Sequence, residues 1–97
     1  MKTASVSRAV LPFISPGTSL TVTIGAASAA SAAVGASVIR LVSTVDCYIA
    51  IGASPTATAT SMFLPAKEPE YFVVDPTNEV AVLQVTGAGT LFITPAQ

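Results

Sequence analysis

The sequence from Val80 to Thr94 reads VAVLQVTGAGTLFIT, two apolar runs separated by a short link that contains two glycines. Branched and aromatic side chains dominate both runs, and such residues favour β-strands over helices. The link from Thr86 to Gly89 is short enough to join the two runs as a hairpin. This segment therefore predicts two consecutive β-strands near the end of the chain, joined by a tight turn.

The rest of the chain repeats this rhythm of short apolar runs and turn residues. From Ser19 to Ile24 polar and apolar side chains alternate strictly, which puts the three large apolar ones on one face of a strand. Further strand-like runs cover residues 38–42, 48–51 and 71–74. Turn residues follow at intervals of about 8–12 residues, the spacing of a sandwich or barrel. The sequence predicts an all-β fold, an antiparallel β-sandwich or a small jelly-roll-like barrel of seven to eight short strands.

We expect the core to consist of the inward-facing apolar residues of these runs. They are Leu20, Val22, Ile24, Ile39, Leu41, Ile49, Ile51, Phe72, Val74, Val80, Val82, Leu91 and Ile93. Arg40 falls on the opposite, wet face of its strand. The six aromatic residues sit in or beside apolar runs and are expected to pack in the core, with Tyr71 beside Glu70 as the one candidate for an exposed ring. The single cysteine, Cys47, begins an apolar run and is expected to be a buried, unreactive thiol.

Residues 26–36 read AASAASAAVGA and allow two interpretations. Alanine is the best helix former, which favours a short helix. However, Gly25 and Gly35 bracket the run, and no large side chain anchors a helical face. We expect a strand of small residues, or a strand plus a loop, while a helix here would indicate an α+β fold.

The charge content points to a chain that works in contact with other subunits. Of the 97 residues, 52% are hydrophobic and only 9% are charged, against about 25% charged in an average soluble domain. Monomers usually keep exposed apolar patches small, so we expect a homo-oligomer or a subunit of a larger assembly. A neutral monomer coated with serine and threonine is the alternative. Four scattered cations do not supply the phosphate contacts that nucleic-acid binding needs, so that class of partner is excluded.

Catalytic, cofactor and membrane roles find little support in the residues. The chain has no histidine, so a Ser-His-Asp or Cys-His arrangement and a Cys/His zinc site are absent. Glu68 and Glu70 are the nearest pair of carboxylates, and beside two prolines they are expected to be ordinary loop residues. The uncharged run from Ile24 to Ile39 is too weakly apolar to span a membrane. We expect a protein that is not an enzyme, binds no cofactor or metal, and does not insert in a membrane.

From Val38 onward a series of short motifs follows an order that is similar to that of a known protein family. The motifs are Ile49–Gly52, Met62–Pro65, Pro69–Phe72, Ala81–Gln84 and Thr90–Thr94. In this order the chain resembles a family of small virion structural proteins of tailed bacteriophages, of the head-decoration or minor capsid type, over residues 18–97. The resemblance implies a scaffold without an active site, located in the virion after assembly in the host cytoplasm. Its implied partners are the phage major capsid protein or other virion subunits.

Residues 1–17 lie outside the resemblance and are predicted to be an N-terminal arm, followed by one β-sandwich domain over residues 18–97. The arm would reach across a neighbouring subunit through its apolar side chains. These are Val6, Val10, Leu11, Phe13 and Ile14. The expected function is capsid decoration or cementing. The alternatives are a neck or tail ring, a fibre-like component, or a decoration module that binds host glycans.

Overall fold

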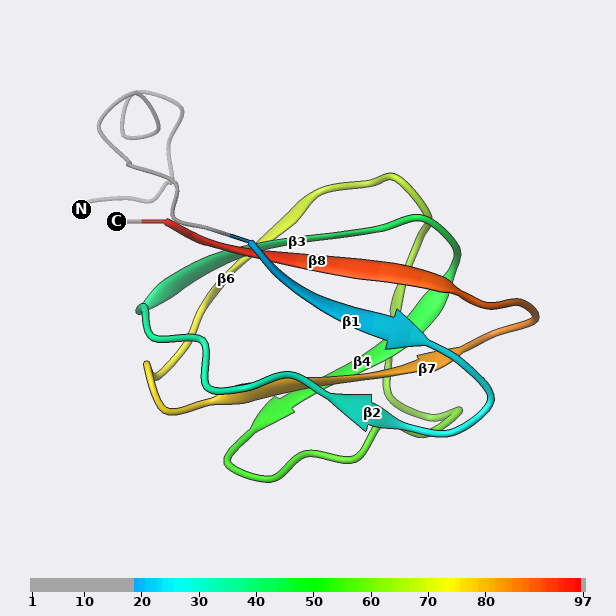
Figure 1. Cartoon of the computed structure of the whole chain (residues 1–97), viewed down its shortest axis with the longest axis horizontal. Helices are drawn as coiled ribbons and strands as arrows, with labels where there is room; N and C mark the ends of the chain where they lie inside the picture. The colour runs from blue at the N-terminus through cyan, green and yellow to red at the C-terminus, as the bar shows by residue number, and fades with distance from the viewer. Residues whose placement is uncertain (1–18, 97) are drawn as a thin grey trace.

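The computed structural model describes residues 19–96, which form eight β-strands and no helix (Figure 1). The strands are β1 (Leu20–Ile24), β2 (Ala29–Ala30), β3 (Val38–Ser43), β4 (Cys47–Gly52), β5 (Met62–Leu64), β6 (Glu70–Val73), β7 (Glu79–Gln84) and β8 (Gly89–Ala96). They make two four-stranded sheets, and every strand pair is antiparallel. The all-β prediction is confirmed.

The strand pairing is nested along the chain. β1 pairs with β8, β2 with β7, β3 with β6, and β4 with β5. Pairing of β3 with β8 and of β4 with β7 then completes the two sheets, in the orders β1-β8-β3-β6 and β2-β7-β4-β5. This is the strand order of a jelly roll, a two-stranded ribbon wrapped into two facing sheets. The sheets stay separate, so the sandwich is present and a closed barrel is not formed by the described residues.

The predicted hairpin between the last two runs is wrong. β7 lies in the second sheet and β8 in the first, so residues 85–88 cross from one sheet to the other. Facing sheets lie about 10 Å apart, a distance that four extended residues span as easily as they turn a hairpin. Local turn chemistry therefore does not distinguish the two outcomes, and the distant partner strands decide between them.

The small-residue run is a strand plus a loop, as expected. Only Ala29 and Ala30 form a strand, paired with β7. Ser31 extends the contact, because its N–H donates to Val80 O at 2.9 Å while its Oγ accepts from Val80 N at 3.1 Å. Gly35 then adopts φ of 70°, a left-handed conformation that glycine reaches at little cost. The small alanine side chains let the loop lie close to the sheet. The Ser31 hydroxyl accepts the hydrogen bond from Val80 N that a backbone carbonyl would accept in a regular strand pair.

The space between the sheets is filled largely by the predicted core. The predicted core residues that are buried are Val22, Ile24, Ile39, Leu41, Ile49, Val80, Val82, Leu91 and Ile93. The remaining ones are only partly buried and pack against this cluster, and they are Leu20, Ile51, Phe72 and Val74. The core also takes in Val34, Cys47 and Leu64.

Candidate assembly surface

The outer face of the first sheet carries a set of apolar side chains. Ile39 and Leu41 point inward and are fully buried, so the alternate residues of β3 point outward. The strand pairing places Val38 opposite Val73, Arg40 opposite Tyr71, and Val42 opposite Phe92. We call this set the outer apolar face, and its members are Val38, Val42, Tyr71, Val73 and Phe92, with Arg40 among them.

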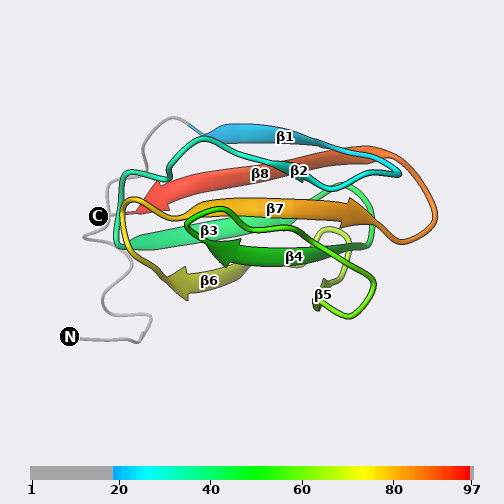
Figure 2. The ribbon, with the colours of Figure 1, turned by 90° about the horizontal axis from the view of Figure 1, so that it is seen from below.

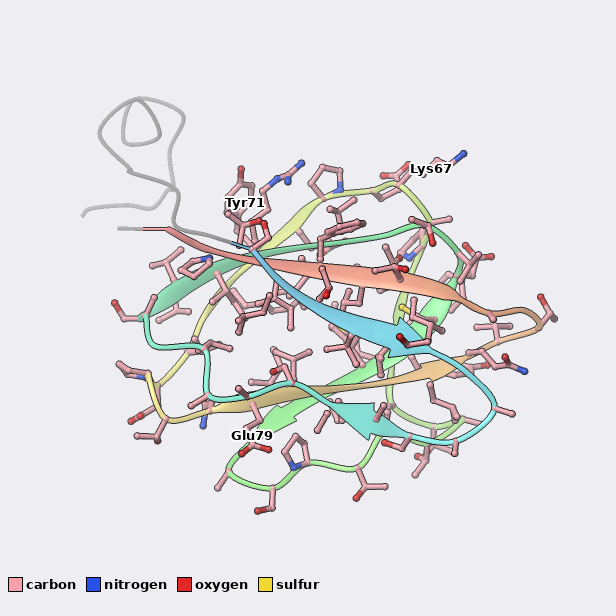
Figure 3. The ribbon with its side chains drawn as sticks, in the orientation of Figure 1. Lys67, Tyr71 and Glu79 are labelled. Atoms are coloured by element: carbon pink, nitrogen blue, oxygen red, sulfur yellow. The ribbon has the colours of Figure 1, made fainter. Side chains whose placement is uncertain are left out.

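Three members of the outer apolar face are well exposed. Val73 is 86% exposed, Tyr71 50% and Phe92 37%. Tyr71 lies on the opposite side of the sandwich from Glu79 (Figure 3). Single exposed apolar residues are normal on a protein, but a group that shares one sheet face is a candidate interaction surface.

Arg40 lies at the centre of this face. It pairs with Tyr71 on one side and Thr94 on the other, and it is half-buried. An arginine side chain covers apolar surface with its methylene groups while the guanidinium stays hydrated. Arg40 therefore points outward as expected, but its neighbours on this face are largely apolar.

The outer face of the second sheet is covered in part by the β4–β5 connection. Residues 53–61 pass in front of this sheet in Figure 2, and the Ala57 N–H donates to Ser28 Oγ at 2.9 Å. Ala57 is 3% exposed and Ala81 of β7 is fully buried. Residues 53–61 thus act as a cover over part of this face. Among the described residues no segment covers the first sheet in the same way.

The edge formed by β5 and β6 adds further exposed apolar side chains. Met62 is 46% exposed and Phe63 47%, and the Phe63 ring meets Tyr48 edge-on at 6.2 Å. β5 and β6 are the terminal strands of their sheets, and a terminal strand presents unpaired backbone groups that invite another chain. The open edge and the outer apolar face meet at β6.

The expectation that the aromatics pack in the core is wrong for Phe63 and Phe92, whereas Tyr71, the one candidate for an exposed ring, is half-exposed. Their strands carry apolar residues at consecutive positions, so both faces of the strand are apolar while only one meets the core. Consecutive apolar residues in β6 and β8 were the available signal for this face. Only Tyr71 was considered as an exposed ring from the sequence.

The proline-rich link between β5 and β6 is a loop anchored by hydrogen bonds to β3 and to the β3–β4 turn. Asp46 Oδ1 accepts from Ala66 N at 2.8 Å, and Ser43 O accepts from Lys67 N at 2.8 Å. Glu68 is exposed in this loop, and Glu70 begins β6 opposite Leu41. Within residues 19–96 no three acidic, cysteine or histidine side chains cluster as metal ligands.

The thiol of Cys47 is fully buried, as expected. Burial raises the pKa of this thiol, an effect that the nearby Ser43 hydroxyl opposes only in part. Ser43 Oγ is itself buried without a hydrogen-bond partner of ordinary geometry among the described residues. A thiol is a weak hydrogen-bond partner. The Cys47 thiol and the Ser43 hydroxyl therefore satisfy each other's hydrogen-bonding capacity only in part.

We expect Cys47 to react with a thiol reagent at pH 8 at least about a thousandfold more slowly in the native protein than in urea, since the reagent must wait for unfolding. Because the folded state holds the thiol proton more tightly, this group stabilises the fold fully below its ordinary pKa of 9.0 and less as the pH rises beyond it. Labelling followed by absorbance checks the rate, and urea denaturation at pH values below and above 9 checks the change in stability. Rapid labelling of the native protein would show that β4 opens locally.

Comparison with known proteins adds no relative. No protein-family model matches the chain, and neither the curated proteins nor the solved structures contain a significant match. Within the described residues, the structure has no helix long and apolar enough to cross a membrane. The predicted contact residues Val6, Val10, Leu11, Phe13 and Ile14 lie outside residues 19–96.

Proposed function

We propose that this chain is a bacteriophage virion structural protein, a capsid decoration or cement protein that acts through contacts between subunits. The observation that carries the proposal is the outer apolar face, which has its most exposed residue, Val73, on an edge strand of the first sheet. The order of motifs from Val38 onward supports the phage assignment. No catalytic step is proposed.

The physical role of such a protein is to bury apolar area. Each Å² of apolar surface removed from water contributes about 25 cal/mol before the costs of association are subtracted. A single contact through one sheet face is therefore modest. Repetition around a symmetric shell lets many modest contacts act together, because the later contacts form at high effective concentration.

One alternative is supported by a specific feature. Tyr71 is half-exposed and lies opposite Arg40 across the β3–β6 pair, and an exposed ring beside a polar group suits a sugar. Jelly-roll sandwiches occur both in viral capsids and in lectins. A glycan-binding decoration module is thus the second candidate, whereas in a neck or tail ring or a fibre-like component the outer apolar face would contact only other copies of the chain.

The test uses empty shells assembled from the major capsid protein of the phage that encodes the chain. We expect the full-length protein to sediment with the shells in a saturable ratio. Val73→Lys should weaken binding by about tenfold or more, because it places a charge in the buried contact. Lysine is tolerated on edge strands, so this variant should fold.

Ala30→Lys is the matched control, since Ala30 is also exposed on an edge strand but belongs to the second sheet. This variant should bind as the unchanged protein does. Equal binding by both variants would remove the outer apolar face from the contact. Failure of every version to sediment with shells would overturn the capsid role and favour the glycan or ring alternatives.

A further inference from the structure

We draw no further inference here: the strongest candidate, the exposed apolar patch of Met62 and Phe63 on the β5 edge strand of the second sheet, beside Tyr48, carries nothing because no feature of residues 19–96 shows what covers it.

Discussion

Leu91→Ala is expected to lower the free energy of unfolding by about 3–5 kcal/mol, the range of large-to-small substitutions in a packed core. Leu91 is fully buried on β8, between Val22 of β1 and Ser43 of β3. β8 is an interior strand of the first sheet, so its neighbours are held on both sides and have little freedom to close the cavity. Urea or guanidinium denaturation followed by circular dichroism measures the loss.

Phe92→Ala provides the control one residue further along the same strand. Phe92 points to the outer side and is 37% exposed, so its truncation should cost about 1 kcal/mol, the span of strand propensities. The same variant should bind shells more weakly, whereas Leu91→Ala should retain binding as long as it is folded. Similar losses of stability from the two substitutions would contradict the assignment of core and outer faces on β8.

Gly89→Ala is expected to destabilise the protein by about 1–3 kcal/mol through overpacking. A Cβ at this position would stand 2.5 Å from Thr44 Oγ1 and 2.7 Å from Val45 Cγ2. Thr44 has little room to move, because its Oγ1 accepts from Thr90 N at 2.9 Å and its N–H donates to Thr90 O at 3.0 Å. The β3–β4 corner therefore sits directly against the start of β8.

Gly87→Ala is the matched substitution in the same link, and nothing lies within 4 Å of the Cβ it adds. Its effect should stay within about 0.5 kcal/mol, as for surface changes away from special features. Comparing thermal midpoints of the two variants isolates the close approach from the general cost of replacing glycine. If Gly89→Ala were as stable as Gly87→Ala, the corner would not be packed on β8 as described.

Strand positions and many inward-facing residues were predictable because they depend on the local sequence pattern. The alternation from Ser19 to Ile24 places Val22 and Ile24 in the core, and both are buried. The same holds for Ile39 and Leu41 on either side of Arg40. Alternate residues of a strand share a face, so the sequence shows which side chains lie together, and it shows which face is inward where only one of the two is apolar.

The candidate surface was only partly predictable. Consecutive apolar residues at Tyr71 to Val74 and Leu91 to Ile93 indicate strands that are apolar on both faces, yet they do not say which outer face receives a cover. In the structure the loop around Ala57 covers part of the second sheet. The contacts of this cover join distant segments, as in the hydrogen bond from Ala57 to Ser28, 29 positions apart.

The sequence alone determined that this protein is built from short strands with a shared apolar interior, because alternation and turn residues act over a few positions. Only the tertiary structure decided which strands pair, that the link from β7 to β8 crosses between sheets, and that Val73, Tyr71 and Phe92 remain exposed together. The physical reason is that these features arise from contacts between distant segments. Their energies depend on which faces meet in space, and no local pattern carries that information.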